Sequence, residues 1–222
     1  MIDTIIFDFD GVILDTETPD FETWQQEFRA HGVEFERSLW TQFIGGGPMW
    51  FDVPGHLAEL AGYPIDPDRI KARRQRYLAR IEDSPVLPGV AQYLEQAREA
   101  GLKVGVASSS SRKWVEGHLT NRGLIGHFNP ITTRDDVANV KPDPELYLKS
   151  AERLGVSPES CVAIEDSLNG VTAAKRAGMA CVVVPNPMTA HMDLSQADLR
   201  LNALSDIPLS TMLQQASEAS DS

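Results

Sequence analysis

The chain has 222 residues, of which 42% are hydrophobic and 23% are charged, proportions typical of a soluble globular protein. This length is enough to bury a sizeable core, as one domain or as one domain carrying an insertion. The net charge of −12 argues against nucleic-acid binding, because that affinity depends on Lys and Arg neutralising phosphates. The sequence contains no run of about 18 apolar residues, so we expect no membrane span and no membrane partner.

The N-terminal segment and the cysteines favour a cytoplasmic location. The segment MIDTIIFDFDG has no basic residue ahead of its apolar stretch and contains aspartates, unlike a secretory signal. Cys161 and Cys181 lie in the apolar runs CVAI and CVVV, where we expect buried thiols and no disulfide. The five histidines lack metal-ligand spacing, so we expect none to be catalytic. A monomer is favoured, with the oligomeric state left open.

Short apolar runs alternate with helical patterns along most of the chain. This order predicts an α/β protein with a Rossmann-like parallel sheet. The predicted strands are Thr4–Phe9, Lys103–Ala107, Ile131–Thr133, Cys161–Ile164 and Cys181–Val184, with Leu199–Leu204 as a candidate edge strand. The predicted helices are Val90–Ala100, Lys113–Arg122, Pro144–Leu154 and Gly170–Ala177. Glycines stand just past the helix ends, as is usual for helix termination.

A long interval between the first strand and Pro88 divides the chain. It reads as helix after helix with no convincing strand, and it is too long for a single crossover between strands. We therefore predict an α/β core at residues 1–15 and 88–213, and a helical cap inserted at residues 16–87. The polar tail QQASEASDS, residues 214–222, is expected to fray.

One basic stretch stands out within the predicted cap. In DRIKARRQRYLAR, four arginines recur at helical spacing and would share one face: Arg69, Arg73, Arg76 and Arg80. A solvated face is the simpler interpretation. The alternative is a positive field that draws anionic substrates toward a cleft.

The strongest functional signal is the segment DFDG, where Asp8 and Asp10 end an apolar strand and Gly11 breaks it. Side chains alternate along a strand, so we expect both carboxylates to point the same way from its carboxyl end. Like charges so close repel each other, and Mg²⁺ with carboxylate ligands is the ordinary way to offset that repulsion. Ligands bind at the carboxyl ends of strands in open α/β sheets. The pair therefore favours a metal site over a simple turn cap.

Three later segments supply what such a site needs. Ser108, in VASSS, ends the second predicted strand where backbone N–H groups would suit an anion, although serine is also a common helix cap. Lys141, in KPDPE, would neutralise phosphate or a carboxylate, although an isolated lysine is more often a surface charge. Glu165 and Asp166, in AIEDS, follow a buried strand where unpaired carboxylates are unfavourable. The two acidic pairs together favour metal binding.

The motifs DFDGV, VASSS, KPDPE and EDS occur in the order found in the haloacid dehalogenase-like phosphatases. Over nearly its whole length the chain resembles the branch that includes phosphoglycolate phosphatases and β-phosphoglucomutases, with a helical cap after the first motif. The resemblance implies that Asp8 is the nucleophile and Asp10 the general acid and base. It also implies that Ser108, Ser109 and Lys141 bind phosphate and that Asp8, Asp10, Glu165 and Asp166 hold Mg²⁺.

The implied activity is Mg²⁺-dependent hydrolysis of a small phosphorylated metabolite, such as a sugar phosphate, through an aspartyl-phosphate. Asp8 attacks the phosphorus, while Asp10 protonates the leaving alkoxide and then activates water. Dehalogenation is disfavoured, because the dehalogenases of the superfamily lack the second aspartate of the first motif, which here is Asp10.

Two alternatives remain beside hydrolysis. A β-phosphoglucomutase has a cap histidine soon after the first motif and an arginine after the cap's glycine-containing loop, where this chain has Asp20 and Pro48. A non-catalytic binding protein on the same fold is disfavoured because no motif residue is missing. The glycines at 45–47 form either a plain turn or a mobile lid loop. The sequence leaves the substrate open, because the cap would select it.

Overall fold

The computed structural model describes residues 2–44 and 51–220. At its centre is a parallel sheet of six strands in the order β3-β2-β1-β4-β5-β6. The strands are β1 (Thr4–Phe7), β2 (Lys103–Ser108), β3 (Ile131–Thr133), β4 (Cys161–Glu165), β5 (Ala180–Val183) and β6 (Leu199–Arg200). The predicted α/β class and Rossmann-like parallel sheet are confirmed.

The strand β1 lies in the middle of this sheet. Ile5 pairs in register with Val104 on one side and with Val162 on the other. A parallel strand covered on both faces carries a continuous apolar run, as TIIF does. The chain builds β2 and β3 on one side of β1 and then returns to β4 on the other. Such a switch opens a crevice at the carboxyl ends of the strands, where ligands bind.

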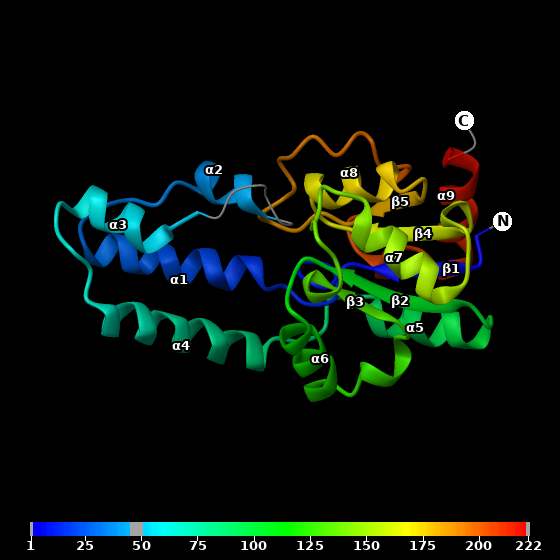
Figure 1. Cartoon of the computed structure of the whole chain (residues 1–222), viewed down its shortest axis with the longest axis horizontal. Helices are drawn as coiled ribbons and strands as arrows, with labels where there is room; N and C mark the ends of the chain where they lie inside the picture. Colours follow the sequence, from blue (N-terminus) through cyan, green and yellow to red (C-terminus); the bar gives the residue numbers. More distant parts are fainter. Residues whose placement is uncertain (1, 45–50, 221–222) are drawn as a thin grey trace.

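Helices cover both faces of the sheet (Figure 1). One hydrophobic cluster joins β1 to α5 (Val90–Glu99), α6 (Arg112–Asn121) and α9 (Leu209–Ser220). A second cluster joins the other face to α7 (Glu145–Leu154) and α8 (Leu168–Arg176). Cys161 and Cys181 are free thiols buried in this second cluster, as predicted.

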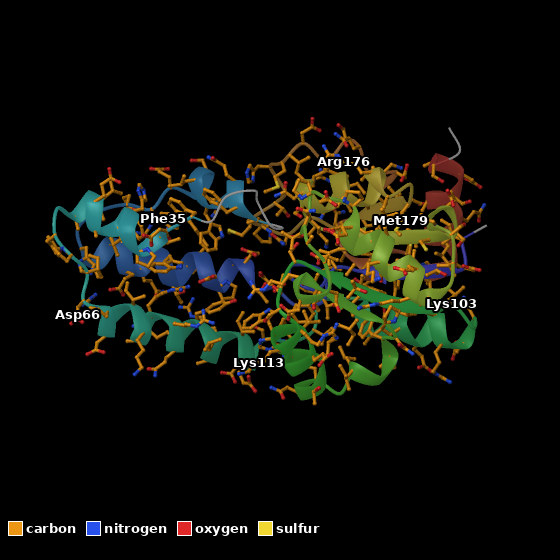
Figure 2. The ribbon with its side chains drawn as sticks, viewed as in Figure 1. Phe35, Asp66, Lys103, Lys113, Arg176 and Met179 are labelled. Carbon is orange, nitrogen blue, oxygen red and sulfur yellow. The ribbon has the colours of Figure 1, made fainter. Side chains whose placement is uncertain are left out.

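The residues between β1 and α5 form a helical body beyond the carboxyl ends of the strands (Figure 1). Its helices are α1 (Glu17–Ala30), α2 (Arg37–Trp40), α3 (Val53–Ala61) and α4 (Pro67–Asp83). They enclose a separate hydrophobic cluster, where Phe35 lies among aromatic side chains of α1 (Figure 2). None of the helices in the described parts of the chain has the length and apolarity that crossing a membrane requires.

Four of the five arginines of α4 pair with residues of α1. Arg73 is only 4% exposed and forms an ion pair with Asp20. This face is solvated in part, because three of its four side chains are 39–47% exposed, yet it also packs against a helix whose acidic side chains oppose its charge. The remaining arginines also pair with α1: Arg69 and Arg76 with Glu27 at 2.6 and 3.0 Å, and Arg80 with Glu22 at 2.9 Å.

The C-terminal segment differs from its prediction. Residues 214–220 do not fray but complete α9, in which Met212 and Ala216 are buried one helical turn apart. An apolar stripe of this spacing stabilises a helix despite a polar composition. The last two residues of the predicted tail, and the glycines at 45–47, lie outside the described residues.

Candidate active site

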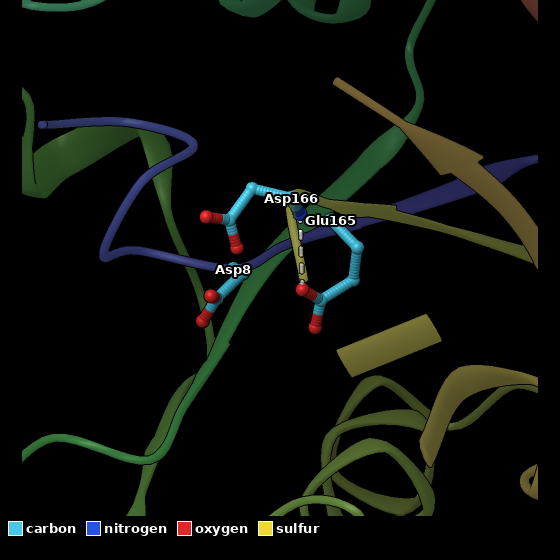
Figure 3. Close-up of side chains that lie close together, drawn as sticks. All are labelled: Asp8, Glu165 and Asp166. Atoms are coloured by element: carbon cyan, nitrogen blue, oxygen red, sulfur yellow. Dashed lines mark hydrogen bonds between the residues drawn. The ribbon is translucent and has the colours of Figure 1, made fainter. Parts of the chain in front are cut away.

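Three buried carboxylates gather at the carboxyl ends of two adjacent strands. Asp8 follows β1, while Glu165 and Asp166 come from the end of β4 (Figure 3). One oxygen from each of the three lies within 4.8 Å of the others. Of the four carboxylates that the sequence indicated for a metal site, these three gather among the described residues, and such a cluster suits a hard divalent cation.

The electrostatics of this cluster call for positive charge. Burial raises the pKa of Asp8 to about 7, with Lys141 acting against this and Glu165 and Asp10 adding to it. Burial, then the charges of Glu165 and Asp8, raise the pKa of Asp166 well above its usual range. Asp166 Oδ1 is buried without a hydrogen-bond partner in the structure. A buried orphan oxygen facing like charges fits a metal ligand.

Lys141 provides one positive charge to this group. The loop before α7 places its Nζ 2.8 Å from Asp8 Oδ1 and 2.7 Å from Glu165 Oε1. Burial opposes the charged form, but the two carboxylates outweigh it and raise the pKa of Lys141. When all three carboxylates are ionised, one lysine leaves two negative charges, which a divalent cation would balance.

Two further residues orient the carboxylates, and the motifs did not identify them. Tyr147 donates a hydrogen bond to Glu165 Oε1, and Asn186 Nδ2 donates one of 2.6 Å to Asp166 Oδ2. Partners of this kind fix ligand orientation around metals. Asn186 follows β5. Its position just after a predicted strand is the signal by which the sequence could have indicated it as a site residue. Gly11 has φ +81°, and a side chain there would clash with the Asp166 carboxylate.

Asp10 lies apart from the cluster. Its Oδ1 accepts hydrogen bonds from Thr16 Oγ1 at 2.8 Å and Trp114 Nε1 at 3.0 Å. Its Oδ2 accepts from Ser110 Oγ at 2.6 Å and Ser108 Oγ at 3.4 Å. The expectation that Asp8 and Asp10 point the same way relied on strand geometry. The strand β1 ends at Phe7, so that alternation no longer applies, and the Asp10 carboxylate is not among the three that gather.

A cavity of about 240 Å³ lies between the core and the helical body. The core side is lined by Asp8, Asp10, Ser109, Ser110 and Trp114, and the cap side by Thr16, Glu17, Asp20, Phe43 and Tyr77. Of the predicted phosphate-binding residues, Ser109 therefore lines the cavity. Ser108 and Lys141 are buried beside it, where they contact Asp10 and Asp8 respectively.

Glu17 and Asp20 make the cap side of this cavity acidic. Burial, with the charges of Asp10, Asp15 and Asp8, raises the pKa of Glu17 to about 8. Asp20, which stands where a β-phosphoglucomutase would have its cap histidine, lines the cavity while paired with Arg73.

Two aromatic residues of the helical body are not among those that line this cavity. Trp24 packs in the cap cluster with the Arg73 guanidinium 4.2 Å from its ring centroid, and Phe51 stacks on Phe43. Trp50 lies outside the described residues.

A larger hollow of about 650 Å³ lies elsewhere, between α6 and α7. Its arginines, Arg112 and Arg153, are paired with Asp136 at 2.6 and 2.7 Å. Arg112 also pairs with Glu116 at 2.7 Å. These pairs offset a positive charge in the first turn of α6, where the helix dipole disfavours a cation, so no bound anion is needed to explain it. The candidate catalytic residues Asp8 and Asp10 line the smaller cavity.

The parallel sheet, the carboxylate cluster at its carboxyl edge and the cavity beneath the helical body define a class, an α/β protein with a candidate active site between core and helical body. The family model "haloacid dehalogenase-like hydrolase" matches residues 2–178. The chain therefore belongs to the haloacid dehalogenase-like hydrolase family.

Individual relatives agree with this assignment. "Putative phosphatase YhcW" of Bacillus subtilis is 46% identical over 96% of this chain and 97% of its own. "Validoxylamine A 7'-phosphate phosphatase" of Streptomyces hygroscopicus is 31% identical over 93% and 96%. The solved β-phosphoglucomutase of Clostridium difficile superposes with a TM-score of 0.75 at 25% identity, covering 98% of each chain. The predictions of the family and of an enzyme of the phosphatase class are confirmed.

Proposed function

We propose that the protein hydrolyses monophosphate esters of small hydroxylated metabolites, with Mg²⁺ bound and an aspartyl-phosphate formed on Asp8. One observation carries this proposal: Asp8 belongs to the carboxylate cluster and also lines the cavity. A nucleophile must reach the phosphorus and also be relieved of its repulsion for an anionic substrate. Asp8 meets both requirements.

Asp8, Glu165 and Asp166 would hold the metal, which when bound offsets the charge between a carboxylate and a phosphate. A contribution from the Asp10 side chain, expected from the sequence, is not part of this proposal because four side-chain donors already surround it.

The remaining roles belong to side chains of the cavity. Asp8 attacks the phosphorus, and Lys141 holds this carboxylate ionised and oriented through the 2.8 Å contact. Asp10 gives a proton to the leaving oxygen and later takes one from the attacking water. Ser109 and Ser110, in the loop between β2 and α6, would donate hydrogen bonds to phosphate oxygens.

The cap side of the cavity favours an uncharged remainder on the substrate. Carboxyl groups such as Glu17 accept or share hydrogen bonds with hydroxyls, whereas a second anionic group would face Glu17 and Asp20. The relative named for validoxylamine A 7'-phosphate is named for a substrate with a single phosphate. Sugar and polyol monophosphates are therefore the proposed substrates.

The test is a panel of phosphorylated metabolites supplied with Mg²⁺ and scored for phosphate release. Sugar and polyol monophosphates should be hydrolysed faster than phosphoglycolate, and Asp8→Asn should abolish release. Asp68→Asn, the same change on the exposed start of α4, is the matched control and should retain activity. Activity that survives both EDTA and Asp8→Asn would refute the proposal. Conversion of β-glucose 1-phosphate to glucose 6-phosphate faster than phosphate release would identify a mutase.

A further inference from the structure

The two oxygens of the Asp10 carboxylate have chemically different partners. Oδ1 accepts from the indole N–H of Trp114 at 3.0 Å and from the Thr16 hydroxyl at 2.8 Å. Among the side chains that the structure describes, Oδ2 contacts only the hydroxyls of Ser110 at 2.6 Å and Ser108 at 3.4 Å. A hydroxyl can donate or accept, whereas an indole N–H can only donate. Oδ1 is therefore committed to accepting, and Oδ2 is not.

The indole is held in place by rings from both bodies of the molecule. Tyr77 of α4 stacks on Trp114 with ring centroids 6.1 Å apart and planes inclined by 14°. His118 packs edge-on against the indole at 4.1 Å, and it also stacks on Phe9. The direction of the N–H is thus set by core and cap together. Pre-organised donors of this kind need no rearrangement during a reaction.

We propose that Trp114 is a positioning residue that reserves Asp10 Oδ1 as an acceptor, so that the proton exchanged with substrate and water is carried by Oδ2. A proton on Oδ1 would point at the indole hydrogen, whereas a proton on Oδ2 can be accepted by a serine hydroxyl that turns. This inference rests on the proposed hydrolysis. It adds which oxygen of Asp10 exchanges the proton when Asp10 acts as general acid and base.

The proton then follows one path in both half-reactions. As the bond from Asp8 to phosphorus forms and the ester P–O bond breaks, the proton on Asp10 Oδ2 moves to the leaving oxygen, which departs as an alcohol. Water then attacks the phosphorus, passes a proton to Oδ2 and releases phosphate, which restores both carboxyl groups. One water is consumed, and one alcohol and one phosphate are formed.

The test compares leaving groups in Trp114→Phe, which keeps a ring against Tyr77 but removes the donor. For an alkyl ester such as glycerol 2-phosphate we expect kcat/KM to fall about 10- to 100-fold, part of the roughly 10²–10⁴-fold that general acid catalysis supplies. For 4-nitrophenyl phosphate, whose leaving group needs no proton, we expect a change within about threefold. The selective loss should lie in kcat more than in KM.

Trp24→Phe is the matched control, because it makes the same truncation in the cap cluster at a residue that does not itself line the cavity. Any loss of kcat/KM in Trp24→Phe should be equal for the two substrates. An equal loss for both substrates in Trp114→Phe, or no loss, would overturn the inference. In that case the loss of hydrolysis in Asp8→Asn would still support the proposed function, so the two proposals fail separately.

A second measurement does not depend on the Trp114 variant folding. The chain has four tryptophans, whose indole N–H signals can be followed by NMR in ¹⁵N-labelled protein. Asp10→Ala should shift upfield the indole signal that shows ring contacts to Tyr77 and His118, and leave that of Trp24 in place. An unshifted Trp114 signal would contradict the hydrogen bond on which the inference rests.

Discussion

Removing the buried charge of Lys141 should destabilise the protein strongly even when no metal is present. Lys141 is 1% exposed, and its Nζ lies 2.8 Å from Asp8 and 2.7 Å from Glu165. At an effective dielectric constant of about 20, each contact contributes a Coulomb attraction of about 6 kcal/mol before desolvation. Breaking a buried ion pair by removing one partner typically costs about 3–5 kcal/mol. We therefore expect Lys141→Met to lower the free energy of unfolding by about 3–5 kcal/mol at pH 8.

The loss of unfolding free energy in Lys141→Met should depend on pH in a defined direction. The pKa of Asp8 is raised to about 7 in the folded protein. A group with a raised folded-state pKa keeps its stabilising contribution below its ordinary pKa and loses it as pH rises through the folded value. Without Lys141 the pKa of Asp8 is raised further. The loss in Lys141→Met should accordingly be smaller at pH 5 than at pH 8.

Urea unfolding followed by circular dichroism, in EDTA at both pH values, measures this difference. Lys149→Met is the matched control, because Lys149 pairs with Glu152 at the surface of α7 and should contribute less than about 0.5 kcal/mol. Asp8→Asn combined with Lys141→Met should be less destabilised than the sum of the single variants. A loss below about 1 kcal/mol at pH 8, or one equal to that of Lys149→Met, would refute the reasoning.

Three further predictions concern the site and its surroundings. Mg²⁺ should raise the melting temperature more at pH 8 than at pH 6, because the ion binds ionised carboxylates and the pKa of Asp8 is raised to about 7; an equal rise at both pH values would argue against this. Asn186→Ala should weaken Mg²⁺ affinity about 10- to 100-fold in the same melting assay, since Asp166 loses its 2.6 Å donor; unchanged affinity would show that Asn186 does not orient the ligand. Burial opposes ionisation of Asp136, but hydrogen bonds from Arg153 and Thr133 hold its pKa well below the usual range, so its stabilising contribution is present above the ordinary pKa and lost as pH falls. Asp136→Asn should therefore lower stability by about 1–3 kcal/mol at pH 7 and by less at pH 3, and an equal loss at both, by urea unfolding, would contradict the assignment.

Much of the fold was predictable because it depends on local patterns. The run TIIF is apolar throughout, as a strand covered on both faces must be, and Ile131–Thr133 was predicted with the bounds that β3 has. The helix α7 begins one residue after its predicted start, where Asp143 accepts a hydrogen bond from the Glu145 N–H. Propensity, capping and turn residues act within a few positions along the chain.

The carboxylates of the site were predictable for a related reason. Asp8 and Glu165 each follow an apolar run, and parallel neighbouring strands bring their carboxyl ends to one edge. Strand assignment alone therefore indicated that these residues would meet, although they are far apart in the sequence.

Contacts between elements that are not neighbouring strands of the sheet were decided only by the tertiary structure. The arginines of α4 met acidic partners 42 to 58 residues earlier in the chain, and Ala216 found a core that made its polar segment helical. Asp10 lines the same cavity as Asp8 but accepts a hydrogen bond from Trp114, which lies 104 residues further on. The sequence by itself determined which residue types meet at the end of the sheet. The packing of cap and core decided how each side chain is oriented there, because that orientation depends on partners that no local pattern records.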